Sequence, residues 1–569
     1  MGQVRIGLTI SGAVSLGAFE GGALAALLTG VQAAQALDPG KPPKLRVDAI
    51  GAASAGAITA VAAARVLTGG LDPVWVMEQA WVTRASAAAL LHNAGPDAPL
   101  SMDGLSQTAL DILRSDASPI DAKKIQEAPV AIRLVLANLR GFNYRIGRVG
   151  QGPRARPPLE ASTYLDWGPF VFQPRADLTE FVQPSEASAV DTGLASGANQ
   201  FGFSPKRLRR SAQLYEENGV TNFPPTTRAG DAFIWYSDGG TIDNEPLGQT
   251  LDISNDMDSD GAGTDYQRIQ LLIHPFPGAP PPATSRAWAD GDNRPTWLQA
   301  FGRAITIIRS QNLYSDLKHA EKTNSQIIWK ERLANALDAF AQTLASAQQV
   351  AWHDALASVV DSIDTDRAPL PRSGQTPVDR SAQSARDLLT SALERIGGLS
   401  GKNAVGIEVI TPFLAEGTAG RPLDQILAGE FLQSFGGFFD EGLRRSDFAL
   451  GFVCMLNWMD TGLEAYQLTA EARDKAIDAA LAAFYGLQKW PMSGTAKSFD
   501  GYGLTDQLKQ RARGLGLQER ESWTPTDFGR MTLGQLPLSE RLLFGRIALR
   551  ILAVALHDLW LRVTGRDKQ

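Results

Sequence analysis

A serine between very small residues is the first pattern that could carry nucleophilic chemistry. The segment Ala52-Ala53-Ser54-Ala55-Gly56 joins an apolar run to a helical pattern. A tight strand-to-helix turn that tolerates only small neighbours is typical of a nucleophile elbow. The start of the helix would place free backbone N–H groups near the serine oxygen. Because Ala52 replaces the usual glycine, the segment alone fits a simple small-residue turn equally well.

A nucleophilic serine needs a base, and Asp238-Gly239-Gly240 offers one. An aspartate at the end of a strand can reach the elbow of a neighbouring strand. In Ser–His–Asp hydrolases the base is a histidine. None of the five histidines has an obvious catalytic setting: His92, His274, His319, His353 and His557. The pattern favours a Ser54–Asp238 dyad. A triad through His274, which follows Asp238 at a strand end, is the weaker alternative.

The loop from Ser11 to Gly17 also joins an apolar run to a helical pattern. Such a loop can present backbone N–H groups to an oxyanion. It is not a phosphate-binding P-loop, because Ala18 and Phe19 stand where that motif has lysine and a hydroxyl residue. It also lacks the three-glycine spacing of dinucleotide-binding loops.

These segments require an α/β scaffold. Strands are predicted over 4–10 and 45–50, each followed by a turn and a helix, over 18–28 and from the elbow to about residue 67. Strand–turn–helix units in succession indicate a parallel sheet with helices on its faces, a three-layer sandwich. Further strands are expected over 131–136, 170–172, 232–236 and 268–274.

The spacing of apolar residues changes to a helical pattern after the proline-rich segment 275–282. Long helical patterns cover 297–361 and 382–396, and most of the remainder is helical. We therefore expect a catalytic α/β domain over residues 1–285 and a mainly helical extension over 286–569. One isolated strand, 405–410, could return to the catalytic sheet.

Composition limits the partners and the location. The formal net charge of −7 argues against a nucleic-acid-binding protein. The single cysteine, Cys454, excludes an internal disulfide and a multi-thiolate metal site, and its apolar surroundings predict a buried thiol. The first residues lack the pattern of a secretion signal. We expect a cytoplasmic protein whose membrane contact, if any, is peripheral.

Four segments occur in an order that resembles the patatin-like phospholipases, a family of lipid acyl hydrolases. They are Ser11–Gly17, Ala52–Gly56, Ala195–Pro205 and Asp238–Gly240. The resemblance covers about the first half of the chain. The segment Phe435–Phe439, with Arg444, Arg445, Asp447 and Phe448, is similar to one in bacterial members that carry a helical extension.

The resemblance implies roles for individual residues. Ser54 is the nucleophile and Asp238 the general base. The oxyanion hole maps to the backbone of Gly12, Ala13, Val14 and Ala55. Glycines that support these motifs are Gly17, Gly56, Gly239 and Gly240.

Two departures from the family pattern bear on the oxyanion loop. The family usually has three glycines where this chain has Gly12-Ala13-Val14, and the bulk of Val14 would narrow the acyl entrance. It usually has arginine or lysine where Leu16 stands, so recognition of an anionic head group would change.

The function implied is hydrolysis of lipid acyl esters, such as phospholipids or acylglycerols, through an acyl-enzyme and without metal or cofactor. Partial burial should raise the basicity of Asp238. Two alternatives remain open. One is a general carboxylesterase with the same dyad. The other is a non-catalytic regulatory protein whose helical half binds a partner.

The C-terminal segment 542–563 is apolar on more than one face and is interrupted by Arg546, Arg550 and Arg562. This pattern favours a packed core helix. A helix lying on a membrane surface is the alternative.

Overall fold

The computed structural model describes most of the chain. It covers residues 2–564 except 93, 96–97, 115–119, 147–158, 184–185, 201, 218, 226, 228–229, 260–265, 277–296, 367–383, 398, 400–404, 431–433, 488–498, 501–502, 518–523, 526–535 and 537.

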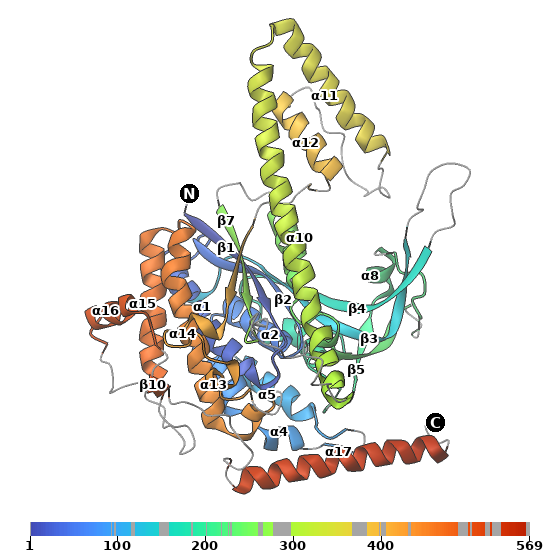
Figure 1. Cartoon of the computed structure of the whole chain (residues 1–569), viewed down its shortest axis with the longest axis vertical. Coiled ribbons are helices and arrows are strands. Elements are labelled where there is room, and N and C mark those ends of the chain that lie inside the picture. The colour runs from blue at the N-terminus through green and yellow to red at the C-terminus, as the bar shows by residue number, and fades with distance from the viewer. Residues whose placement is uncertain are drawn as a thin grey trace, which may run out of the picture. The chain divides into compact units, whose positions relative to one another are not determined.

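An eight-stranded sheet forms the centre of the fold (Figure 1). Seven strands follow the order β5-β6-β3-β2-β1-β7-β8, and β4 pairs with β3. The middle of the sheet is parallel, since β1 runs parallel to β2 and β7, and β2 to β3. The pairs of β3 with β4 and β6 are antiparallel. The predicted α/β class with a mainly parallel sheet is thus confirmed. The strands are β1 Gln3–Ile10, β2 Leu45–Ala52, β3 Val130–Ile146, β4 Leu159–Phe172, β5 Lys206–Arg210, β6 Ala232–Asp238, β7 Tyr266–Ile273 and β8 Gly406–Ile410.

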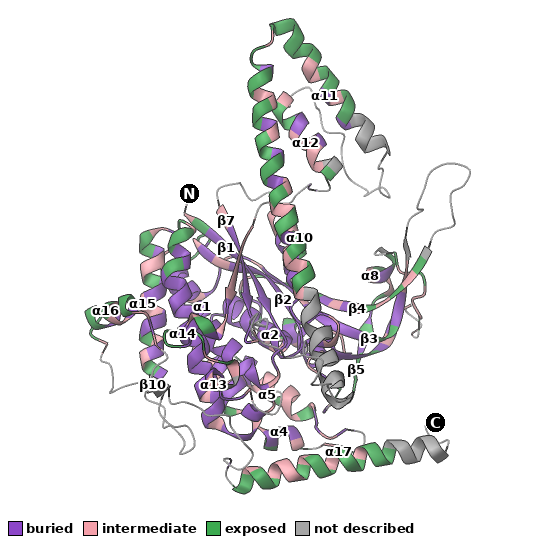
Figure 2. Ribbon diagram, in the orientation of Figure 1, coloured by how far each residue is buried: buried purple, intermediate pink, exposed green. Residues whose placement is uncertain are grey.

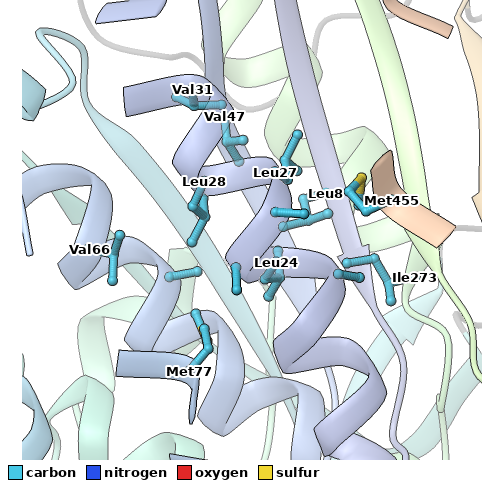
Figure 3. Close-up of a cluster of buried hydrophobic side chains, with 14 of the residues drawn as sticks. Leu8, Leu24, Leu27, Leu28, Val31, Val47, Val66, Met77, Ile273 and Met455 are labelled. Carbon is cyan, nitrogen blue, oxygen red and sulfur yellow. The ribbon is translucent and has the colours of Figure 1, made fainter. Parts of the chain in front are cut away.

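Helices cover both faces of this sheet. On one face, Leu8 of β1 lies among the buried side chains of α1 (Gly17–Gln35), including Leu24 and Leu27 (Figure 3). On the other, Thr9 Oγ1 donates to Thr250 Oγ1 of α9 (Leu247–Ser259) at 2.7 Å. The alternation of neighbouring β1 residues between the faces produces the layers. Other helices are α2 Ala55–Gly69, α3 Pro73–Glu78, α4 Ala87–Leu91, α5 Asp103–Leu113, α6 Leu178–Val182, α7 Ala189–Ser196, α8 Ala212–Glu217, α13 Leu423–Ile426, α14 Glu441–Ala465, α15 Ala470–Leu487, α16 Asp506–Gly514 and α17 Leu538–Thr564.

Helix α1 is the core helix of the fold. All of its residues except Thr29 are buried. By length and composition alone, Val14–Gln35 would suffice to cross a membrane, but 89% of its most apolar window is buried inside the fold. Its apolar character is therefore explained by packing on every side.

Two glycines bring α1 and α14 into close contact. A Cβ on Gly22 of α1 would lie 1.8 Å from the backbone oxygen of Phe448, and a Cβ on Gly451 of α14 would lie 1.9 Å from that of Phe19. The backbones touch at this crossing because both positions lack side chains. The second half of the chain thus packs directly on the first.

The chain divides into two compact units, and the boundary expected at residue 285 needs correction. The larger unit comprises residues 1–254, 263–313 and 407–569. The smaller comprises 255–262 and 314–406. Most of the expected extension belongs with the catalytic sheet, because β8 lies beside β7 and α14 packs on α1.

The smaller unit consists mainly of helices. The helical pattern predicted over 297–361 forms α10 (Trp297–Ala341), which enters this unit at residue 314, and α11 (Ser346–Asp366). Helix α12 (Ala385–Gly397) packs on α11. Their shared core consists of Ala334, Leu356, Val360, Leu388, Leu389 and Ala392. In the larger unit, two further strands, β9 (Phe499–Asp500) and β10 (Thr524–Pro525), form a short antiparallel ladder apart from the main sheet.

Candidate active site

Ser54 lies at the sharp turn between β2 and α2. Its backbone has φ 54° and ψ −126°, and the residue is 6% exposed. A positive φ outside glycine costs about 1–3 kcal/mol and is concentrated at functional sites. A Cβ on Gly56 would lie 2.5 Å from Ser11 O, so the turn requires glycine there. This strained strand-to-helix turn has the geometry of a nucleophile elbow.

Asp238 ends β6 and is buried, with 1% of its surface exposed. Its Oδ2 accepts a hydrogen bond from Asn199 Nδ2 at 3.0 Å, and its Oδ1 accepts one from the Gly240 N–H at 2.9 Å. Its own N–H donates to Ala198 O at 3.0 Å. These bonds fix the orientation of the carboxylate.

The serine and the aspartate meet at Gly240. A Cβ on Gly240 would lie 3.3 Å from Ser54 Cβ and 3.2 Å from Asp238 Oδ1. The two side chains therefore flank the same point, although they come from strands that β3 separates in the sheet. Any side chain at Gly240 would enter the space between the proposed nucleophile and base. Gly239 is equally constrained, since its Cβ would lie 2.1 Å from Val135 O.

Two polar residues support these groups, one at the end of α7 and one in the segment that follows it. Ser196 Oγ accepts from the Ser54 N–H at 2.8 Å and donates to Val135 O at 2.6 Å. It thereby ties the elbow to β3, while Asn199 holds Asp238. Sequence reasoning identified this segment only as a resemblance and gave neither residue a role. The bonds join residues 142 and 39 positions apart, and no local pattern reveals such pairs.

The predicted oxyanion donor Gly12 needs correction. Its N–H donates to Asn244 O at 2.9 Å, and its carbonyl accepts from Asn244 Nδ2 at 3.1 Å. The Gly12 N–H is therefore engaged within the fold. A Cβ at Gly12 would lie 2.9 Å from Ser54 Cβ, so this glycine provides space for the serine.

The remaining candidate donors to an oxyanion are the backbone N–H groups of Ala13, Val14 and Ala55. In the described part of the chain, the N–H groups of Ala13 and Val14 donate to no other backbone or side-chain group. Ala55 is the first residue of α2, and N–H groups in a first helical turn have no partner within the helix. Val14 and Ala55 line the same cavity as Ser54.

Val14 has a backbone that suits glycine better than valine. Its φ is 55°, in the left-handed region that a β-branched side chain rarely adopts. The strain explains physically why a glycine is usual at this position in the family that the sequence resembles. Leu16, the other departure, is fully buried, so it cannot contact a head group from where it lies.

The C-terminal part of the larger unit holds the loop Ser11–Gly17 in place. The Ser15 N–H donates to Ser434 O at 3.1 Å, and the Ser15 hydroxyl donates to the same carbonyl. The Gly437 N–H donates to Ser15 Oγ at 3.1 Å. Arg444 of α14 then donates to Gly437 O at 2.8 Å and to Val82 O at 2.7 Å. Residues more than 400 positions away thus fix the loop beside Ser54.

An apolar cavity of about 100 Å³ opens beside Ser54. Its wall comes from α2, α5, α7, the turn after α3 and the segment that contains Phe435 and Phe438. Apart from Ser54, only Thr108 and Asn199 contribute hydroxyl or amide side chains. The aliphatic and aromatic lining includes Val14, Ile58, Val61, Trp81, Leu90, Leu105, Ile112, Leu113, Val190, Leu194 and Phe203. Such a lining suits a hydrocarbon chain.

His274 occupies a structural position at the end of β7. Its backbone N–H donates to Ile410 O at 2.9 Å, which links β7 to β8. Its Nδ1 lies 3.8 Å from Glu245 Oε1, and burial lowers the pKa of the imidazole to about 4. The imidazole does not line the cavity at Ser54. The geometry favours a dyad over a triad through His274.

The fold is that of an α/β protein whose Ser54 lies at a strained strand-to-helix turn. Residues 8–251 match the sequence model of the patatin-like phospholipase family. The match spans Ser54 and Asp238 and confirms the resemblance inferred from the four segments. A comparison with curated proteins returned no match.

Proposed function

We propose that the protein hydrolyses lipid acyl esters with Ser54 as nucleophile and Asp238 as general base. The observation that carries the proposal is the strained elbow serine, which lies beside a buried aspartate and at an apolar cavity. The match of residues 8–251 to the model of a lipid acyl hydrolase family supports the class of substrate.

The reaction proceeds in two steps. Asp238 takes the proton of the Ser54 hydroxyl while the oxygen attacks the ester carbonyl, and the backbone N–H groups of Val14 and Ala55 stabilise the oxyanion. The proton passes from Asp238 to the departing alcohol, which leaves an acyl-enzyme. Asp238 then removes a proton from water, which attacks the acyl carbon and returns Ser54 to its hydroxyl form.

The apolar lining of the cavity favours binding of a hydrocarbon acyl group over a small polar one. An acyl chain in the cavity would contact side chains such as Ile58, Leu105 and Leu194, and each buried methylene contributes about 0.8 kcal/mol. Part of this binding energy orients the carbonyl at Ser54. We therefore expect kcat/KM to rise with acyl length until the cavity is filled.

The test compares Ser54→Ala and Asp238→Asn with the wild type on esters of graded chain length and on phospholipid vesicles. Each substitution should lower kcat by about 10³-fold or more, because it removes one member of a catalytic unit. Ser254→Ala is the matched control: Ser254 is a buried serine on α9 that accepts from Gln270 Nε2 at 2.9 Å, on the other face of the sheet. It should retain wild-type rates.

Activity that survives Ser54→Ala would refute the mechanism. A wild type that prefers short soluble esters would instead indicate a general carboxylesterase. No hydrolysis of any ester by a folded wild type would favour a regulatory protein.

A further inference from the structure

Helix α17 carries an exposed stripe of leucines on one face. Leu538, Leu542, Leu549, Leu552 and Leu556 are 65%, 62%, 69%, 56% and 57% exposed. Their spacing of three, four or seven residues places them along one side of the helix. Figure 2 shows the described part of α17 as exposed or intermediate along its length. The expectation of a packed core helix was therefore wrong.

Between Leu543 and Arg550, the opposite face of α17 is fixed to the rest of the larger unit. Phe544 packs on Phe439 with ring centroids 5.8 Å apart, and Leu543 and Ile547 join the same cluster. Arg550 donates to Pro99 O at 2.9 Å and to other carbonyls of the same loop. Because these contacts hold one face, the leucine stripe points away from the protein.

The same contacts place α17 next to the wall of the acyl cavity. It packs on α4 and on the segment Gly436–Phe439. Leu90 of α4 and Phe438 of that segment both line the cavity at Ser54. A surface that covers the leucine stripe would therefore lie close to the elements that receive the acyl chain.

The charges of α17 fit a lipid surface better than a protein partner. No aspartate or glutamate occurs from Arg541 to His557, although the whole chain carries a net charge of −7. On a helical projection, the exposed Arg541 and Arg546 flank the leucine stripe on its two sides. Leucines bordered by arginines are the chemistry of a helix that lies in a bilayer interface, where arginines reach anionic head groups.

We propose that α17 docks the protein on a phospholipid bilayer, with the leucine stripe inserted between the lipids and Arg541 and Arg546 on the head groups. The inference rests on the proposed lipid hydrolase function and assigns the site where the enzyme meets its substrate. It places the cavity wall at the bilayer from which an ester must be drawn.

The experiment measures flotation of the full chain with vesicles of phosphatidylcholine alone and with added phosphatidylglycerol. All proteins carry Ser54→Ala, so that lipid hydrolysis does not alter the vesicles. Leu542→Ser/Leu549→Ser should weaken partitioning by about tenfold for each leucine. The matched control is Leu139→Ser/Leu515→Ser, two leucines that are 52% and 45% exposed outside α17, and it should bind as the parent does.

A second pair of variants tests the charges. Arg541→Gln/Arg546→Gln should weaken binding to the anionic vesicles by about fivefold to thirtyfold, since each basic residue near such a surface contributes about 1 kcal/mol. Binding to phosphatidylcholine alone should change little. In the catalytically intact chain, Leu542→Ser/Leu549→Ser should lower activity on vesicles while activity on a short soluble ester stays unchanged.

Three results would overturn the docking proposal. The Ser54→Ala parent could fail to float with either vesicle. The leucine pair could bind as strongly as its control. The parent could sediment as a dimer that the leucine substitutions convert to a monomer without affecting flotation, which would identify a second copy of the chain as the partner. Failure of the wild type to hydrolyse any ester would refute the proposed function separately, because flotation requires no catalysis.

Discussion

The crossing of α1 and α14 predicts that two glycine-to-alanine substitutions change the free energy of unfolding in opposite directions. In Gly451→Ala the new Cβ would lie 1.9 Å from Phe19 O, inside the contact limit for any carbon and oxygen. The obstacle is backbone, so relief requires the two helices to separate. Overpacking of a core costs about 1–3 kcal/mol, and the rigid helix places this substitution at the upper end or beyond.

Gly486→Ala is the matched comparison. Gly486 lies in α15, which also packs on α1, but a Cβ there would meet nothing within 4 Å. Alanine exceeds glycine in helix propensity by about 0.5–1 kcal/mol, so this variant should be more stable than the wild type. The two glycine-to-alanine changes should therefore shift the free energy of unfolding in opposite directions, by about 2–4 kcal/mol relative to each other.

Urea unfolding followed by circular dichroism measures both values. A larger effect is expected on activity for Gly451→Ala, because separation of α14 from α1 also pulls Arg444 away from Gly437 and so loosens Ser15. A Gly451→Ala protein as stable as Gly486→Ala would refute the claim that the two halves of the chain share one tightly packed core.

Two further predictions concern strain and buried charge. Val14→Gly removes a left-handed valine, whose strain of about 1–3 kcal/mol exceeds the added entropy cost of glycine, so the free energy of unfolding should rise by about 1 kcal/mol. The variant should also accept bulkier acyl groups, which would appear as a higher kcat/KM for esters of branched-chain acids. A Val14→Gly protein less stable than the wild type would contradict the argument from strain. Asp447 accepts from the N–H groups of Ala428 and Gly429, and burial raises the pKa of its carboxyl from 3.8 to about 7. Its contribution to stability is therefore complete below pH 3.8 and is lost as the pH rises through about 7. The stability advantage of the wild type over Asp447→Asn should accordingly be smaller at pH 8 than at pH 5 in urea titrations, and a constant difference would show that the carboxyl does not titrate in this range.

Sequence patterns predicted the sheet and located Ser54 and Asp238 as candidates, because strands and the turns that follow them depend on local order. Apolar runs followed by small residues locate β1, β2 and the elbow at Ser54, and the predicted helix at 18–28 lies within α1. Asp238 was found because two glycines follow a strand. The expectation that it reaches the elbow of a neighbouring strand was wrong about the neighbour, since β3 lies between β6 and β2 in the sheet.

The errors share a physical cause. The resemblance implied Gly12 as a donor, but Asn244, 232 positions away in the sequence, bonds to Gly12. The boundary at residue 285 followed a change of period, and periodicity carries no information about which helices share a core. Helix α17 was expected to be buried because its composition is apolar, whereas exposure depends on how much protein surrounds it.

The bonds between Ser15 and the segment at Ser434 have a consequence for biosynthesis. As the chain emerges from the ribosome, Ser54, Asp238 and most of the residues of the cavity wall precede residue 260, yet the loop proposed to hold the oxyanion bonds to partners at Ser434 and Gly437. We therefore expect a nascent chain to contain Ser54 and Asp238 long before it can hydrolyse an ester. A chain truncated after residue 285 should be inactive for this reason, and an active one would argue against it. Under the proposed function, late completion of this kind would delay ester hydrolysis until the protein is almost fully made.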